Sequence, residues 1–570
     1  MNGGKQDERT RRLAGEVGAI NKSQGGRLSV ALAFPNTYSI GMSTLGFHIV
    51  YREFNAHPLV VCERAFLPEV ADRWSLRSSR LTSLESDTPL ADFDVVAFSI
   101  HFEMDYANIL RILDLAGIPR RASQRGDANP LIIAGGPCAT FNPEPLAEFV
   151  DAFVIGDAEG VVAEIAEALL NAQSHEEALE SLAQLTGVYV PRFYEVEYAP
   201  DGRVSNAVNL PPAPRKVKRG IAADLDADGA FSVIRTPDTE FGESILAEMT
   251  RGCARQCRFC VAGYISLPPR PRLVRPPNPA EAKRRGLGLV GPSVLDHPNA
   301  LAICSDLVEM GTRFSVSSLR AESLTPGLAN LIARAGQRTL TIAPETGTLR
   351  LRKVINKAAA DEELLGAARM AGDAEFSKLK LYFMVGLPTE TDEDVAAIAD
   401  LVAGIAAECR IPVEISVSAF VPKPWTPFQW YGMANEKILR RRLSILRKNL
   451  KKLNDMPWLR QRITTNFESP GLAVVQGILA RGDRRVSTLI ATAADSGGNW
   501  RVGLETSVAD PACYAYRERQ TDEILPWDHI DMLVSKEYLI EEYRRALREE
   551  TSDGCDFGGC VKCGVCLQDH

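Results

Sequence analysis

The sequence predicts an α/β protein in which a doubly wound domain precedes a (βα)6 partial barrel of the TIM type and a small C-terminal cysteine-rich region. Short apolar runs such as RLSVALAF, DVVAFSI and PLIIAGGP alternate with amphipathic stretches such as YANILRILDLAG, which is typical of parallel strands covered by helices. A second series, from SILAEM to VEISVSAF, contains about six strand–helix units, which favours a barrel over an open sheet. Four closely spaced cysteines mark the end of the chain.

These patterns divide the chain into five segments. Residues 1–26 are polar and charged, and they predict a flexible tail. Residues 27–201 carry the first series, and the irregular residues 202–242 predict a linker. Residues 243–432 carry the barrel, and residues 433–570 predict a helical and mixed region that ends in the cysteine cluster.

The composition argues against several classes of protein. The net charge of -8 over 570 residues gives no basic excess of the kind that a chain built mainly to hold nucleic acid shows. No apolar run approaches the about 18 residues of a membrane-spanning helix, and the start MNGGKQDERTRR lacks the apolar core of an export signal. We therefore expect a cytoplasmic protein with no membrane partner. Twelve cysteines in a reducing compartment indicate metal or redox chemistry.

The predicted strands of the first domain end in loops rich in glycine, proline and asparagine. Ligands of open α/β sheets bind at the carboxyl ends of the strands. The candidate binding loops are residues 35–41, 99–102, 135–140 and 156–160.

A cysteine trio follows the first predicted strand of the barrel, in the stretch GCARQCRFC. Cys253, Cys257 and Cys260 supply three thiolates, which is one too few to close a tetrahedral metal site. They suit three irons of a [4Fe–4S] cluster and leave the fourth iron open to a small molecule. The alternatives are a chance grouping or a zinc knuckle with a distant fourth ligand, although a knuckle is typical of small, loop-rich modules.

The trio, with Phe259 before its third cysteine and EMTRGC around its first, resembles the radical S-adenosylmethionine (SAM) superfamily. The resemblance implies that Cys253, Cys257 and Cys260 are the catalytic cluster ligands and that SAM completes the fourth iron. It also implies reductive cleavage of SAM to methionine and a 5′-deoxyadenosyl radical, with electrons from an external donor of the flavodoxin or ferredoxin type.

Further cofactor contacts are carried over from the superfamily by position. Gly291 and Ser293 occupy the place of a Gly-Gly-Glu segment that receives the methionine amino group, but the glutamate is missing here. The polar residues that end the later strands suit the ribose hydroxyls and the methionine carboxylate, and a glycine would let the backbone approach the adenine. These residues are Ser318, Arg320, Glu345, Arg350 or Arg352, and Gly386, and Phe259 before the third cysteine is also expected to contact the cofactor.

The N-terminal domain resembles the Rossmann-like, B12-binding-type domain that precedes many radical SAM barrels, through PLIIAGGPCATFNPEPLAEFVDAFVIGDAEG. The resemblance implies cobalamin as a cofactor. The loop after the first strand reads FPNTYSIG, so it lacks the D-x-H-x-x-G motif that supplies a histidine ligand. His48 and His101 are nearby alternatives, and a domain that binds no cobalamin would serve as a fold relic or a substrate platform.

The C-terminal pattern Cys555-x4-Cys560-x2-Cys563-x2-Cys566 supplies four thiolates, enough for a second [4Fe–4S] cluster or for a structural zinc ion. We favour a second [4Fe–4S] cluster over zinc, because the first cluster needs an electron and a second cluster could relay it.

Three functions follow from these features, and the substrate is open in each. With cobalamin bound, methyl transfer to an unactivated carbon or a rearrangement is expected. With sulfur on the second cluster, methylthiolation of RNA or protein is expected, and the basic helix near Arg440 would then contact RNA. The third is a non-enzymatic electron carrier or cluster scaffold.

Overall fold

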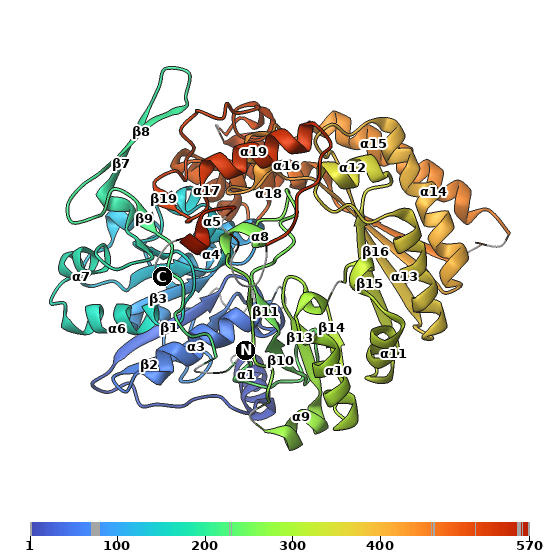
Figure 1. Cartoon of the computed structure of the whole chain (residues 1–570). Helices are drawn as coiled ribbons and strands as arrows, with labels where there is room; N and C mark the ends of the chain where they lie inside the picture. The colour runs from blue at the N-terminus through green and yellow to red at the C-terminus, as the bar shows by residue number, and fades with distance from the viewer. Residues whose placement is uncertain are drawn as a thin grey trace.

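The computed structural model describes residues 3–69, 80–226, 229, 231–276, 278–317, 319–457, 459, 462–507, 509–555, 560 and 562–567. In Figure 1 the N-terminal domain and the barrel lie side by side, and the red C-terminal segment crosses the top of both. No helix in these ranges is both long and apolar enough to cross a membrane.

The N-terminal domain is built on a six-stranded sheet in the order β2-β1-β3-β4-β5-β6. The first five strands are parallel, and only β6 runs antiparallel to its neighbour. Helices α3 (Leu45–Ala56) and α6 (Val161–Asn171) pack against each other and against β1. The strands are β1 (Leu28–Phe34), β2 (Val60–Phe66), β3 (Val95–Ser99), β4 (Leu131–Gly135), β5 (Ala152–Val154) and β6 (Val188–Tyr189).

The barrel region contains seven parallel strands in two adjoining sheets. The first sheet has the order β10-β13-β14 and the second the order β15-β16-β17-β18. A parallel bridge between Leu319 and Ile342 connects the two sheets. The strands are β10 (Ile245–Glu248), β13 (Leu287–Val290), β14 (Phe314–Val316), β15 (Thr339–Glu345), β16 (Lys378–Val385), β17 (Val413–Ala419) and β18 (Ile463–Phe467). The partial barrel is confirmed, and β18 adds a strand beyond the six predicted.

Helices cover the outer face of the barrel strands. On β16 the residues Leu379, Leu381, Phe383 and Val385 alternate with more exposed ones, which is the burial pattern of a strand with one face against helices. The covering helices are α10 (Ala300–Glu309), α11 (Pro326–Arg334), α13 (Asp361–Asp373), α14 (Asp392–Cys409) and α15 (Glu436–Asn454).

The N-terminal 26 residues do not form the predicted flexible tail throughout. Gly3–Gly15 form helix α1, and the carboxylate of Glu16 pairs with the buried guanidinium of Arg64 at 2.6 Å. The Tyr51 hydroxyl also accepts a hydrogen bond from the backbone of Ile20 at 2.9 Å. The polar composition misled the prediction, because the ion pair that holds this segment is formed with a residue about 50 positions away in the sequence.

The predicted linker begins with ordered structure. Strand β8 (Val204–Asn209) pairs with β7 (Tyr194–Tyr198) in a hairpin that projects from the molecule in Figure 1. Strand β9 (Val217–Lys218) pairs with β19 (Ile530–Asp531), which ties the linker to the C-terminal region.

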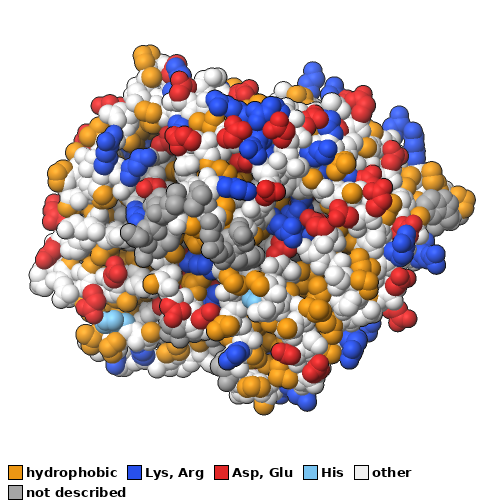
Figure 2. Space-filling view, viewed as in Figure 1, with side chains coloured by type: hydrophobic (Ala, Val, Ile, Leu, Met, Phe, Trp, Pro, Cys, Tyr) orange, Lys and Arg blue, Asp and Glu red, His pale blue; other side chains and the backbone are white. Residues whose placement is uncertain are grey.

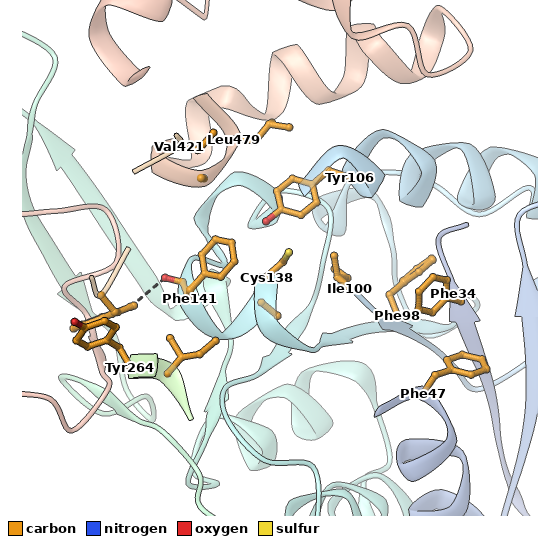
Figure 3. Packing of buried hydrophobic residues seen from close by; sticks show 14 of the residues in the cluster. Phe34, Phe47, Phe98, Ile100, Tyr106, Cys138, Phe141, Tyr264, Val421 and Leu479 are labelled. Atoms are coloured by element: carbon orange, nitrogen blue, oxygen red, sulfur yellow. Dashed lines mark hydrogen bonds between the residues drawn. The ribbon is translucent and has the colours of Figure 1, made fainter. Parts of the chain in front are cut away.

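One continuous hydrophobic core joins the domains. Figure 3 shows part of it, where residues of the first domain meet Tyr264 of the barrel region and Leu479 of helix α16 (Pro470–Arg481). This shared core fixes the carboxyl edge of the first sheet relative to the start of the barrel, which is where the candidate site lies.

Candidate functional site

The cysteine trio lies in a tight loop after β10 and the short strand β11 (Thr250–Arg251). Gly252 opens the loop at φ 77°, and a Cβ atom there would lie 2.3 Å from the Ser266 carbonyl oxygen, so only glycine fits. The Cys260 amide donates to the Cys257 carbonyl oxygen at 3.0 Å, which turns the chain back between these two ligands. The loop is therefore folded by its own backbone before any ligand is considered.

The thiols of the trio lie in a partly buried setting. Burial raises the pKa of Cys253, and burial with the neighbouring Cys257 and Cys253 sulfurs raises the pKa of Cys260 to about 12. Within the described residues, no three His, Cys, Asp or Glu side chains form a group suited to a metal ion. Each protein ligand of a [4Fe–4S] cluster binds a different iron, so three cysteine thiolates are a donor set whose chemistry fits such a cluster.

Arg320 contacts the trio directly. Its Nη1 atom donates to the Cys257 sulfur at 3.3 Å, and Glu322 binds the other side of the guanidinium. Burial opposes the charge on Arg320, but the Cys257 sulfur and Glu322 raise its pKa. A permanent positive charge beside a cluster ligand stabilises the extra electron of the reduced state.

We expect Arg320→Met to lower the reduction potential of the cluster. Losing a charge-assisted hydrogen bond costs about 1.5–3 kcal/mol, so SAM cleavage at a fixed reductant should slow by about 10- to 100-fold. A potentiometric titration followed by electron paramagnetic resonance (EPR) measures the shift. Arg255→Met is the matched control, since the Arg255 guanidinium binds Asp296 and Ser323 instead of a sulfur. An unchanged potential in Arg320→Met would contradict the assignment.

A network of polar side chains anchors the cysteine loop to the loop after β13. The Ser293 hydroxyl donates to Asp296 at 2.6 Å, and Asp296 pairs with Arg255 at 2.5 Å. The structure thus brings Ser293 close to the cysteine loop, and Gly291 lies next to Thr250, two residues before Gly252 of that loop. Phe259 packs against the hydrophobic core. Ser318 lies outside the described residues.

The other predicted cofactor contacts have protein partners. Glu345, at φ 68°, binds the Lys357 ammonium at 2.8 Å. Arg350 pairs with Asp394 and with Glu549, and the buried Arg352 pairs with Asp361. Their roles toward SAM therefore stay predictions.

Gly386 follows β16, and its amide donates to the Glu390 carboxylate at 2.6 Å. Burial raises the pKa of Glu390 to about 7, against the opposing effect of Arg442 at 2.8 Å. A carboxyl whose pKa is higher in the folded state binds its proton more tightly there, so stability falls as pH rises from about 4.5 to about 7.

We expect Glu390→Gln to remove this pH dependence, which is on the order of 3 kcal/mol for a shift of this size. Thermal unfolding of the iron-free protein between pH 5 and pH 7.5 measures it. Asp392→Asn, which changes a more exposed carboxylate paired with Arg441, should leave the slope intact. A slope that survives in Glu390→Gln would refute the assignment.

Sequence reasoning missed the contacts between the trio and the C-terminal segment. Arg258 is fully buried and binds Glu542 of helix α19 (Lys536–Leu547) at 3.0 Å. The Tyr538 hydroxyl of the same helix donates to the Gln256 side chain. The sequence signal for this contact was Arg258 within GCARQCRFC, but its partner Glu542 could not be predicted because it lies 284 positions away.

The first of the C-terminal cysteines lies beside the loop of the trio. The Cys555 amide donates to the Ala254 carbonyl oxygen at 2.5 Å, so the two cysteine segments are hydrogen-bonded to each other. Burial raises the pKa of Cys555 to about 12, with further contributions from the sulfurs of Cys560, Cys563 and Cys566. Cys555, the first cysteine of the C-terminal set, is therefore adjacent to the loop of the trio.

A cavity separates the carboxyl edge of the first sheet from the cysteine loop. Its volume is about 330 Å³. On one side it is lined by the ends of β1, β3, β4 and β5 and by the facing sides of α3 and α6. On the other side it is lined by Thr250, Gly252, Gly291 and Pro292. Three of the four predicted binding loops contribute to it, whereas residues 35–41 do not.

The cavity lies where the strand order reverses between β1 and β3, which is the usual binding position in open α/β sheets. Gly136, at φ 100°, lines it, and a Cβ atom there would lie 2.6 Å from the Ile100 carbonyl oxygen. Arg251 binds Asp157 and Glu159 of the first domain and Glu248 of β10. This ion-pair cluster holds the two walls together immediately before Cys253.

Comparisons with known proteins agree with this architecture. A family model described as radical SAM proteins, N-terminal, matches residues 46–191, and the radical SAM superfamily model matches residues 247–402. The uncharacterized protein MJ0966 of Methanocaldococcus jannaschii is 30% identical over 475 residues, which are 80% of this chain and 90% of that protein.

Two solved structures show similar folds at low identity. The radical S-adenosylmethionine methyltransferase TsrM from Kitasatospora setae, solved with cobalamin and a [4Fe-4S] cluster, is 15% identical with a TM-score of 0.47, over 84% of this chain and 100% of that one. The cobalamin-dependent S-adenosylmethionine radical enzyme OxsB, solved with aqua-cobalamin and S-adenosylmethionine, is 11% identical with a TM-score of 0.44, over 91% of this chain and 79% of that one.

Proposed function

The chain belongs to the radical SAM superfamily, and from this premise we propose that it is a cobalamin-dependent enzyme that methylates or rearranges an unactivated carbon. The superfamily implies a [4Fe–4S] cluster and SAM. Cys253, Cys257 and Cys260 would hold the cluster, and SAM would complete its fourth iron. Cobalamin would supply a cobalt-bound methyl group or a cobalt-centred radical partner.

The observation that carries the proposal is the cavity between the first sheet and the cysteine loop. Its volume of about 330 Å³ lies within the roughly 300–1,000 Å³ of ligand pockets, and it opens at the carboxyl ends of the strands, where open α/β sheets bind their ligands. Its deep part runs between the sheet and helices α3 and α6, which suits a ligand with a long tail. Its mouth reaches Gly252, the neighbour of Cys253, so the occupant would face the cluster.

The residues of the chain have definite tasks in this proposal. The Arg320 guanidinium stabilises the negative charge of the Cys257 thiolate. The ion pairs of Arg251 with Glu159 and Glu248 hold the first domain at a fixed distance from the cysteine loop. The shared hydrophobic core shields the back of the site from water. These groups orient the cofactors, while the cofactors supply the bond-breaking chemistry.

The proposal is tested by reconstituting the full chain without air, adding hydroxocobalamin and measuring retained cobalamin by absorbance after gel filtration. About one cobalamin per chain is expected, along with 5′-deoxyadenosine or S-adenosylhomocysteine when SAM and a reductant are added. A chain that cleaves SAM but retains no cobalamin would contradict the proposal. A product that gains a methylthio group would favour the alternative, methylthiolation.

The basic helix α15 bears on that alternative. Arg440, Arg441 and Arg442 pair with the carboxylates of Glu436, Asp392 and Glu390. Figure 2 shows Lys and Arg mixed with Asp and Glu along the edge that carries α14 and α15. Paired arginines offer less positive potential to RNA than the sequence run indicates, so methyl transfer or rearrangement remains the favoured function.

The C-terminal thiols fit a second [4Fe–4S] cluster that relays electrons to the first. The hydrogen bond from Cys555 to Ala254 supports this proposal, because it fixes the two sets next to each other. We expect Cys563→Ala to lower iron from about eight to about four atoms per chain while the trio keeps its cluster. Iron and zinc analysis measures this, with Cys409→Ala, another buried cysteine, as the control. Zinc in the native protein that Cys563→Ala loses would contradict the relay.

A further inference from the structure

His101 stands at the switch point of the first sheet. It follows β3 by two residues and lines the cavity that faces the cysteine loop. Its ring stacks on Phe34 of β1, with centroids 5.8 Å apart and an interplanar angle of 27°. Gly46 of α3 leaves room for the ring, since a Cβ atom there would lie 3.4 Å from His101 Cε1. The imidazole is therefore held between the two strands that flank the switch point.

The two ring nitrogens of His101 have different surroundings. Nε2 lies 3.0 Å from the hydroxyl of the buried Ser99, whereas Nδ1 has no hydrogen-bond partner among the described residues. Burial lowers the pKa of His101 to about 4, so the ring is neutral at pH 7. A neutral imidazole that donates one N–H to a fixed acceptor presents its other nitrogen lone pair to a metal.

His48, the other histidine near this domain's first strand, is arranged differently. Its Nε2 lies 2.9 Å from the Met42 carbonyl oxygen, and its Nδ1 accepts from the Ile234 amide at 3.4 Å. Both nitrogens are engaged, and His48 does not line the cavity. Of the two histidines near the missing D-x-H-x-x-G position, only His101 offers a nitrogen to the cavity.

We propose that His101 Nδ1 is the axial protein ligand of cobalt when cobalamin occupies the cavity, with Ser99 accepting the Nε2–H. The inference rests on the proposed cobalamin function and deepens it. In this inference a histidine from the loop after β3 takes the role that the D-x-H-x-x-G histidine has in the loop after the first strand of other cobalamin domains. The two loops lie at the same switch point, because β1 and β3 are neighbours in the sheet.

EPR of the cobalt(II) form tests the inference. The full chain is produced with ¹⁵N-histidine and loaded with cobalamin of natural isotope content. A histidine ligand splits each cobalt line into a doublet, because ¹⁵N has spin one-half. The cofactor's own benzimidazole nitrogen would give a triplet, and a water ligand would give no nitrogen splitting. A triplet or an unsplit line from bound cobalamin would overturn the inference while leaving the cobalamin proposal intact.

Variants assign the doublet to one of the seven histidines of the chain. His101→Gln should lose the doublet. His57→Gln should keep it, because His57 caps the end of α3 and its ring pairs with Glu167. Ser99→Ala should keep the doublet but weaken cobalamin retention by about tenfold, the usual cost of losing a partner of a metal-binding histidine. A doublet that persists in His101→Gln would overturn the assignment. Failure of the native chain to retain any cobalamin would refute the proposed function itself, and this inference with it.

Discussion

Cys257→Ala is expected to abolish reductive SAM cleavage. Cys257 is buried whereas Cys253 and Cys260 are partly buried, and its sulfur receives the hydrogen bond of Arg320. With only two thiolates left, one iron of the cluster loses its protein ligand, and the cluster should not survive reconstitution. The expected result is the loss of the cluster absorbance of the trio and a fall of 5′-deoxyadenosine to background.

The measurement is chromatography of 5′-deoxyadenosine from anaerobically reconstituted protein with SAM and a strong reductant. Cys513→Ala is the matched control, because Cys513 is an isolated, exposed cysteine. It should retain full iron content and activity. SAM cleavage at the native rate in Cys257→Ala would rule out the trio as the catalytic cluster site, whatever the C-terminal cysteines bind.

Ala158→Trp is expected to empty the cavity of cobalamin while sparing the cluster. Ala158 follows β5, lines the cavity and is only half-buried, so an indole there would project into space that the ligand needs. A steric conflict of about 1–3 kcal/mol corresponds to a loss of affinity of about 10- to 100-fold. Cobalamin retained per chain after gel filtration, together with iron content, measures the effect.

The control is Ala172→Trp. Ala172 caps the opposite end of α6 and does not line the cavity. Unchanged cobalamin retention in both variants would show that cobalamin, if bound, lies elsewhere. Loss of iron together with cobalamin in Ala158→Trp would mean that the substitution damages the fold, and Gly46→Val, which crowds His101 from α3, then tests the same cavity from its other wall.

The sequence by itself determined the features that depend on local spacing. Short apolar runs between turn residues and amphipathic stretches predict buried parallel strands, so both strand series could be predicted before the structure. Cys253, Cys257 and Cys260 lie within eight residues, so their spacing alone places them in one loop. The positions of Ser293 and Arg320 near the trio also follow from strand order, because consecutive parallel strands end at the same edge.

Only the tertiary structure decided the contacts between distant segments. Cys555 meets Ala254, and Arg258 meets Glu542, across about 300 residues of chain. The helix at residues 3–15 and the position of His101 opposite the cysteine loop likewise depend on partners from other elements. Charged and polar side chains choose partners by packing and burial, which vary with the whole fold, whereas strand and cysteine spacing are fixed by backbone geometry within a few residues.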